Sequence, residues 1–165
     1  MAKRIPIKGY GQVELNQVAF RRDGRIEAQC RIADGIDYIE NGMILAVNHA
    51  DRTVGYPTSG DKFLALNYTT EHMYDERLVG GLRHFKLDKD TVLPRLGYLA
   101  TGDKFTTNCI STENGTEDEA EAATYGHASA DGSILVNTTA ENAILKVVKA
   151  TTMPDGQFAL QFVAL

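Results

Sequence analysis

The sequence predicts a mainly β protein: a single β-barrel or β-sandwich-like domain with an extended N-terminal arm and one short helix. Short apolar runs of strand length recur along the chain, some alternate apolar and polar residues, and turn residues separate them. The chain has 165 residues, 43% apolar and 24% charged, which is enough for one domain with a sizeable core. We place the arm at residues 1–11 and the β-rich domain at residues 12–165.

The predicted strands lie between clear turn signals. Asp23-Gly24 separates QVELNQVAF from IEAQCRI, and Asp-Gly between two such runs is typical of a β-hairpin because glycine readily adopts positive φ. Residues 26–32 alternate apolar and polar side chains, as in a half-buried strand. Further strands are predicted for MILAVN, KFLALNYTT, SILVNTT, NAILKVVKATT and QFALQFVAL. Short strands at this spacing favour a barrel or sandwich over βαβ units.

The last predicted strand runs to Leu165 and is expected to be tied into a sheet. It places Phe158, Leu160 and Phe162 on one face. The preceding turn, residues 153–156, has a proline that fixes φ and a glycine suited to the left-handed position.

One short helix is predicted at residues 116–123. Thr116 is suited to cap its N-terminus, Glu119 follows three residues later, and acidic residues fill the first turn, where the helix dipole favours negative charge. Residues 70–78, TEHMYDERL, fit either a short helix or an irregular loop, which Gly80-Gly81 ends.

The tetrapeptide Gly-Asp-Lys-Phe occurs twice, at residues 60–63 and 102–105. We interpret both copies as structural: Gly-Asp forms a turn, and Lys-Phe begins a strand whose phenylalanine points inward. The motif is not a phosphate-binding loop, because the pattern G-x-x-x-x-G-K is missing.

Charge is distributed unevenly. The net charge is −5, yet residues 1–31 carry seven basic and three acidic side chains, so the remainder carries −9. This asymmetry predicts a basic end that meets an acidic partner, or else a solvated hairpin with exposed arginines. A direct nucleic-acid role fits poorly, because a chain of this charge repels phosphate outside its basic end.

The sequence offers no membrane or export signal that we recognise. No apolar run approaches the roughly 20 residues that span a bilayer, and the basic N-terminus lacks an apolar segment after it. We therefore expect no membrane partner and a protein that stays in the compartment where it is made.

Candidate catalytic groups are few. His49 lies near Asp51, and His72 lies near Asp75 and Glu76, but neither H-E-x-x-H nor G-x-S-x-G nor G-x-G-x-x-G occurs. A metal-dependent β-barrel enzyme built on these groups is the less favoured alternative. We expect no catalytic residues, no metal and no cofactor, and we interpret the chain as a binding or structural protein.

The two cysteines, Cys30 and Cys109, are far apart in the chain and form no C-x-x-C motif. They fit two buried reduced thiols or, alternatively, one disulfide.

Several segments resemble small proteins encoded beside the major capsid protein of tailed bacteriophages. The residues that carry this resemblance are MAKRIPIKGYGQVELNQVAFRRDGRIEAQCRI, ENGMILAVN, LALNYTTEHMYDE and LPRLGYLATGDKFTTN. The resemblance extends to about residue 112 and does not explain residues 113–127, which include an acidic segment at 113–121.

The resemblance implies a head decoration, or cement, protein that binds the expanded capsid from outside and stabilises its lattice. It also implies the major capsid protein as partner, self-association on the lattice (possibly as a trimer), and a location on the virion exterior after assembly in the host cytoplasm. An N-terminal arm that adds a strand to the capsid protein fits this role. The candidate capsid-binding residues are Lys3, Arg4, Ile5, Ile7, Lys8 and Tyr10 on the arm, with Arg21, Arg22 and Arg25 at the first hairpin tip. The alternative within the same class is a tail, neck or head-fibre subunit.

Overall fold

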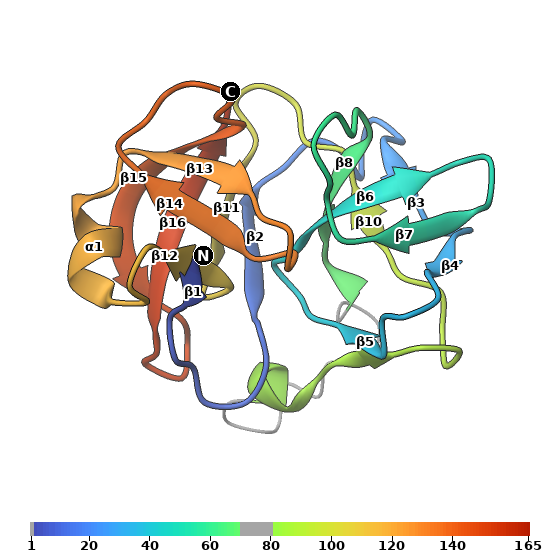
Figure 1. Cartoon of the computed structure of the whole chain (residues 1–165), viewed down its shortest axis with the longest axis horizontal. Helices are drawn as coiled ribbons and strands as arrows, with labels where there is room; N and C mark the ends of the chain where they lie inside the picture. The colour runs from blue at the N-terminus through green and yellow to red at the C-terminus, as the bar shows by residue number, and fades with distance from the viewer. Residues whose placement is uncertain (1, 70–80) are drawn as a thin grey trace.

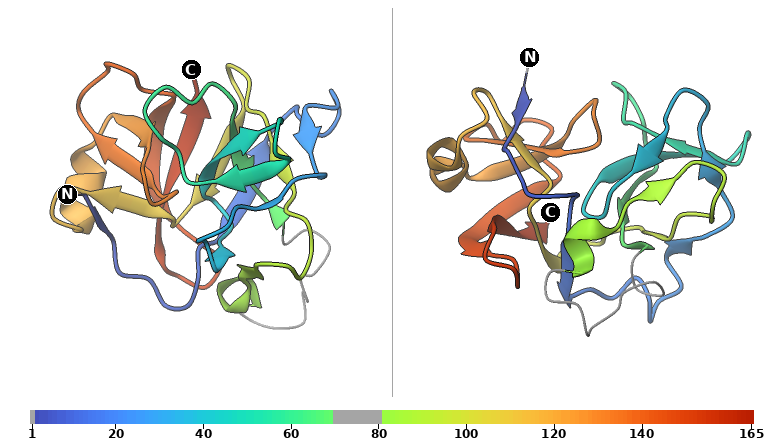
Figure 2. Two further views of the ribbon diagram at one scale, coloured as in Figure 1. Left: turned by 45° about the vertical axis from the view of Figure 1, so that its right-hand side comes forward. Right: turned by 90° about the horizontal axis from the view of Figure 1, so that it is seen from below.

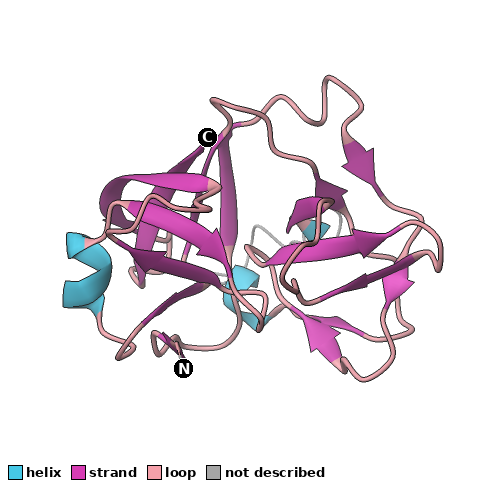
Figure 3. Cartoon of the chain, turned by 45° about the horizontal axis from the view of Figure 1, so that its top comes forward, coloured by secondary structure: helices cyan, strands magenta, loops and turns pink. Residues whose placement is uncertain are grey.

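Two β-sheets lie side by side in the computed structural model, which describes residues 2–69 and 81–165 (Figures 1 and 3). The larger sheet has eight strands, in the spatial order β1 (Lys3–Arg4), β12 (Ile110–Thr112), β14 (Ile134–Asn137), β13 (Tyr125–Ala128), β15 (Leu145–Thr152), β16 (Phe158–Ala164), β11 (Lys104–Thr107) and β2 (Val13–Gln17).

The smaller sheet has six strands, in the order β3 (Ile26–Glu27), β10 (Leu96–Gly97), β8 (Leu64–Asn67), β6 (Ile44–Asn48), β7 (Thr53–Gly55) and β4 (Arg31–Ile32). A separate pair joins β5 (Tyr38–Ile39) to β9 (Leu87–Asp88), and a 3₁₀ helix spans Gly81–His84. Only β12–β14 and β4–β7 are parallel pairs among the described strands.

The prediction of a mainly β fold is confirmed, and the arrangement is closer to a sandwich than to a barrel. The edge strands of the larger sheet, β1 and β2, do not pair with each other within the described chain, so that sheet is not closed. Side chains from both sheets share one core cluster, in which Ile44 and Leu66 of the smaller sheet meet Phe105 and Phe162 of the larger one. A second cluster lies within the smaller half, around Leu45, Val54 and Leu96.

The apolar runs MILAVN, KFLALNYTT and SILVNTT form β6, β8 and β14, and the C-terminal runs form β15 and β16. Strand β16 lies between β15 and β11 and is antiparallel to both, so the expected anchoring of the C-terminus is confirmed. Phe158 packs against the core, while Leu160 and Phe162 are fully buried in it. The preceding turn forms as predicted, with Gly156 at φ +83° and its N–H bonded to the Met153 carbonyl at 2.8 Å.

The predicted hairpin around Asp23-Gly24 is wrong in its pairing. The turn itself forms, since Gly24 has φ +70° and the Arg25 N–H donates to the Phe20 carbonyl at 2.8 Å. However, β2 pairs with β11 of the larger sheet, whereas β3 pairs with β10 of the smaller one. The turn therefore carries the chain from one sheet into the other.

The helix predicted at 116–123 is α1 (Glu117–Ala122). The Thr116 Oγ1 accepts the Glu119 N–H at 3.4 Å, which is the predicted N-cap. On its inner side Ala120 is fully buried in the core, so this short helix is held by packing as well as by its cap. The ambiguous segment at residues 70–78 lies outside the described residues.

The extended N-terminal arm expected at residues 1–11 is not confirmed. Residues Lys3 and Arg4 form β1 and pair with β12, and the Ile5 N–H donates to the Ile110 carbonyl at 3.0 Å. Further along, the Tyr10 N–H donates to the Arg83 carbonyl at 2.8 Å. The segment crosses the molecule in contact with it, as Figure 2 shows from two directions.

Candidate interaction surface

The nine residues predicted to bind a capsid fall into two groups that the fold separates. The N-terminal strand and the turn between β2 and β3 lie on different sides of the molecule in both views of Figure 2. The basic side chains of these nine residues therefore lie in two separate regions of the surface.

Several side chains of the N-terminal group make contacts within the protein. Ile5 is only 4% exposed and belongs to the shared core, so it is unavailable to a partner. Tyr10 packs edge-to-face on Tyr38, with ring centroids 5.8 Å apart. Lys3 and Lys8 are exposed, whereas Ile7 is half-buried.

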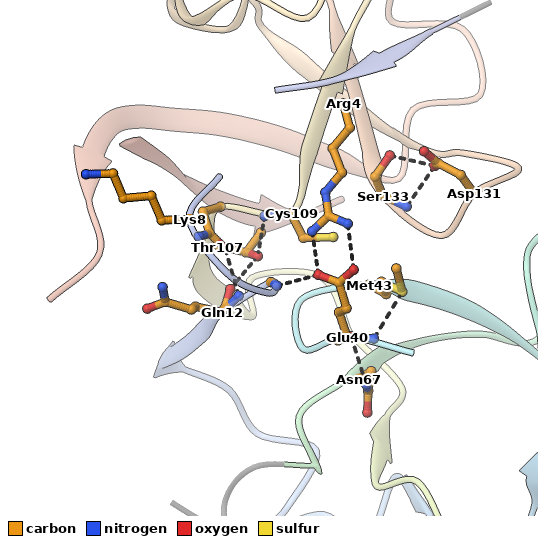
Figure 4. Close-up of polar contacts among 12 residues, drawn as sticks. Arg4, Lys8, Gln12, Glu40, Met43, Asn67, Thr107, Cys109, Asp131 and Ser133 are labelled. Atoms are coloured by element: carbon orange, nitrogen blue, oxygen red, sulfur yellow. Dashed lines mark hydrogen bonds and ion pairs between the residues drawn. The ribbon is translucent and has the colours of Figure 1, made fainter. Parts of the chain in front are cut away.

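Arg4 forms a partly buried ion pair with Glu40 that joins the two halves of the molecule (Figure 4). The Arg4 Nη1 and Nη2 donate to the two Glu40 carboxylate oxygens at 2.7 and 2.6 Å, and the Gly11 N–H also donates to this carboxylate. Burial by itself lowers the pKa of Arg4, but the hydrogen bonds and charge of Glu40 raise it above its ordinary value. Arg4 therefore stays charged and has a structural role.

The backbone around this ion pair is tightly packed. Gly42 has φ +82°, and a Cβ there would lie 2.0 Å from the Thr107 Oγ1 of the larger sheet. Next to it, the Ile44 N–H donates to the Gly132 carbonyl at 2.9 Å, which links the two halves through their backbones. The polar cluster in Figure 4 is thus an inter-sheet joint, and its donors and acceptors are largely used within the protein.

The second group lies at the turn between β2 and β3. Arg21 and Arg22 are exposed, and the Arg22 Nε lies 2.8 Å from the carboxylate of its neighbour Asp23. Arg25 is half-buried: its Nη2 lies 3.5 Å from the Asp103 carboxylate, and its Nη1 donates to the Tyr98 carbonyl. Arg25 therefore fixes the turn against β10 and β11, while the other two arginines face solvent.

An aromatic patch that was not predicted is linked to this turn through Tyr98, whose N–H donates to the Arg25 carbonyl at 2.9 Å. It consists of His49, Phe63 and Tyr98. The His49 ring packs edge-to-face on Phe63 with centroids 4.9 Å apart, and its Nε2 lies 3.3 Å from the Tyr98 hydroxyl. Burial and the charge of Glu27 raise the pKa of Tyr98, so its hydroxyl stays protonated near neutral pH.

The two Gly-Asp-Lys-Phe copies explain why this patch was missed. Both form the predicted turn: Gly60 and Gly102 have φ +99° and +95°, and each aspartate accepts the N–H of the residue three positions earlier. Phe105 is fully buried, as expected, but Phe63 is 55% exposed, so the inward orientation was wrong for the first copy. Strand β8 begins one residue after Phe63, whereas β11 already includes Phe105. No local signal in the shared motif distinguishes the two.

Of the two histidines of the enzyme alternative, the structure describes only His49. His49 contacts aromatic rings, and its Nδ1 lies 3.8 Å from the Glu27 carboxylate. His72, Asp75 and Glu76 lie outside the described residues. In the portions 2–69 and 81–165, no group of three or more His, Cys, Asp or Glu side chains is placed to hold a metal ion.

Cys30 and Cys109 are both buried and free, at 3% and 0% exposure, which agrees with the reduced-thiol alternative. Burial raises the pKa of both thiols, and that of Cys109 reaches about 12 despite the nearby charge of Arg4.

We therefore expect neither thiol to react readily in the folded protein. A pKa near 12 lowers the thiolate fraction of Cys109 by about a thousandfold relative to an ordinary cysteine. A chromogenic thiol reagent at neutral pH should titrate both cysteines in denaturant and almost none without it. Rapid labelling of the native protein at Cys109 would contradict the burial described above.

No family model matches the chain, and no curated protein or solved structure is significantly similar to it. Of the helices in the described part, none has the length and apolar character to cross a membrane.

Proposed function

We propose that this protein is a structural virion protein that binds the outer surface of a tailed-bacteriophage capsid and stabilises the head lattice. Its partner is the major capsid protein, with further contacts between copies on the lattice. It acts on the capsid exterior after assembly in the host cytoplasm, and it does so as a binding protein without catalysis. The resemblance of residues 1–112 to decoration proteins supports this role.

The observation that carries the proposal is the exposure of Phe63 in an aromatic patch that is hydrogen-bonded to the arginine-rich turn through Tyr98. Protein interfaces are built around aromatic and arginine side chains with a polar rim. Phe63 has the apolar area of such an anchor, and His49 holds its ring in place from one side. Arg21 and Arg22 supply positive charge that suits carboxylates on a capsid surface.

The structure changes which of the predicted residues we assign to this contact. The basic-aromatic surface, consisting of Arg21, Arg22, His49, Phe63 and Tyr98, is the primary binding region. Lys3, Ile7 and Lys8 remain available for a second contact at the N-terminal strand. Arg4, Ile5, Tyr10 and Arg25 support the fold that presents these side chains.

Co-sedimentation with capsids that lack this protein tests the proposal. We expect saturable binding to expanded shells and none to unexpanded procapsids. Phe63→Ala should weaken binding by about 30-fold, the effect of losing an interface anchor of about 2 kcal/mol. Arg22→Glu should weaken capsid binding more at low salt than at high salt, because salt screens the interactions of exposed charges.

Leu93→Ala is the matched control, because Leu93 is 50% exposed but lies outside the basic-aromatic surface. It should bind like the unmodified protein. Equal binding by Phe63→Ala and Leu93→Ala would reject this surface. A failure of the unmodified protein to bind either kind of shell would favour a tail, neck or head-fibre subunit instead.

A further inference from the structure

The outer face of the larger sheet carries three lysines in two neighbouring cross-strand rows. Lys104 on β11 and Lys146 on β15 are both paired with Val163 on β16, one from each side. Lys149 is paired with Gln161, two residues from Val163 on the same strand. Directly paired residues, and residues two apart on one strand, point to the same face. All three ammonium groups therefore extend from one face.

A β-bulge in β15 produces this arrangement. Val147 is paired with Phe162 and Lys149 with Gln161, so Val148 has no partner on β16. In a regular strand Lys146 and Lys149 would point to opposite faces, because side chains alternate. The extra residue shifts the alternation by one position and brings both lysines to the outer face.

This face is open to solvent. Lys146 and Lys149 are exposed, Val148 is 46% exposed, and Lys104 and Val163 are half-buried. The opposite face carries Phe105 and Phe162, which are fully buried in the shared core. The sheet thus has one core face and one face that a partner can reach.

Polar side chains between the lysines are already fixed by hydrogen bonds. The Asn16 Oδ1 accepts the Thr106 hydroxyl at 2.7 Å and the Gln161 Nε2 at 3.2 Å. These bonds hold the middle of the face in one arrangement, so a partner would meet a surface that needs little reordering.

The three lysines outnumber the one carboxylate that the described pairings place on this face, that of Glu14, which is paired with Thr106 in the Gln161 row. Elsewhere, Lys86 pairs with Asp88 at 2.5 Å and Lys89 with Asp34 at 2.7 Å. The ion pairs of the described residues include none of Lys104, Lys146 and Lys149.

We infer that this lysine face, defined by Lys104, Lys146 and Lys149, docks the acidic helix α1 of a second copy of the chain. The contact is heterologous: the lysine face of one copy meets α1 of the next, an arrangement that closes into a ring or extends along a lattice. The inference rests on the proposed function for its biological setting, a lattice that brings many copies together, but the contact itself needs no capsid.

Charge complementarity within the chain identifies the occupant. Residues 113–121 contain five acidic side chains and no basic one. Glu117, Asp118 and Glu121 are exposed on α1, whereas Ala120 anchors the helix in the core, so the helix presents its carboxylates outward. This role also accounts for the acidic segment that the resemblance leaves unexplained.

Nucleic acid is a poorer occupant for the same face. Single-strand binding surfaces combine basic residues with exposed aromatic rings for stacking. Tyr125, opposite Lys146, is the only aromatic residue that the described pairings place in these rows, and it is half-buried. The chain as a whole carries −5.

Sedimentation velocity of the full-length protein over a concentration series tests the inference. We expect the protein to self-associate at a salt concentration of about 20 mM, and we expect this association to weaken strongly at about 500 mM salt. The double variant K146E/K149E should self-associate with a dissociation constant at least about tenfold higher, because attraction is replaced by repulsion at two positions. The variant E117K/D118K should show the same defect. Arg52→Glu, a charge reversal of an exposed basic residue between β6 and β7 of the smaller sheet, should associate normally.

Mixing the two double variants supplies the decisive result. The reversed face of one then matches the reversed helix of the other, so association should return although each variant alone is defective. A monomer at all concentrations up to millimolar, or variants that associate as the unmodified protein does, would overturn the inference. Binding of a single-stranded DNA oligonucleotide that is lost in K146E/K149E, with self-association unchanged, would overturn it in favour of nucleic acid. Capsid binding by monomeric protein would leave the proposed function standing even if this contact failed.

Discussion

Replacing Glu40 with alanine is expected to destabilise the folded protein by about 3 kcal/mol, because it leaves the partly buried Arg4 guanidinium without its counter-charge. The substitution also removes the acceptor of the Gly11 N–H at a buried position. Both losses fall at the joint between the two sheets. Chemical denaturation monitored by circular dichroism measures this effect as a lower midpoint with a similar slope.

The exposed carboxylate of Asp34 provides the control. It pairs with Arg31 at 3.3 Å and with Lys89 at 2.7 Å, and its side chain is 76% exposed. Asp34→Ala should therefore cost less than about 1 kcal/mol. Replacing Arg4 and Glu40 together with Met and Leu should recover much of the lost stability, because no unpaired charge remains. A loss for Glu40→Ala as small as that for Asp34→Ala would contradict the structural role of the ion pair.

Phe105→Ala is expected to destabilise the protein by about 3–5 kcal/mol, as large-to-small changes at buried aromatic positions do. Phe105 is fully buried and its ring packs on that of Phe162 with centroids 5.6 Å apart. Phe63→Ala, in the same Gly-Asp-Lys-Phe motif, should change stability by no more than about 0.5 kcal/mol because Phe63 is largely exposed.

Thermal and denaturant unfolding of the two variants side by side measures this contrast. The two substitutions remove the same atoms from the same tetrapeptide, so composition and unfolded-state effects largely cancel. Similar losses of stability would mean that Phe63 is buried after all, and the basic-aromatic surface would then lose its anchor. A stable Phe63→Ala protein is also what the capsid-binding test requires.

The parts of the fold that sequence patterns predicted are those set by neighbouring residues. The runs that became β6, β8 and β14, the turn at Gly156 and the capped helix α1 all depend on local preferences. What failed was the choice of partner. The turn at Asp23-Gly24 formed, but its two flanking segments joined different sheets, because pairing is decided by distant strands.

The same reason explains why the predicted extended arm is not confirmed. The sequence of the N-terminal segment predicts a free basic arm. In the fold, Arg4 of this segment binds Glu40, which is 36 residues away in the sequence. The lysine face depends on an unpaired Val148 in a run that reads as a regular strand. In both cases the role of a charged residue depends on a distant contact or a bulge that the neighbouring residues in the sequence do not predict.

The position of β16 between β15 and β11 has a consequence for how the larger sheet forms. Among the described strands, β11 and β2 join the rest of this sheet only through β16. Until β16 is in place, β15 and β11 each present an unpaired strand edge. Such edges can pair with another chain, so slow docking of β16 is expected to favour aggregation during folding.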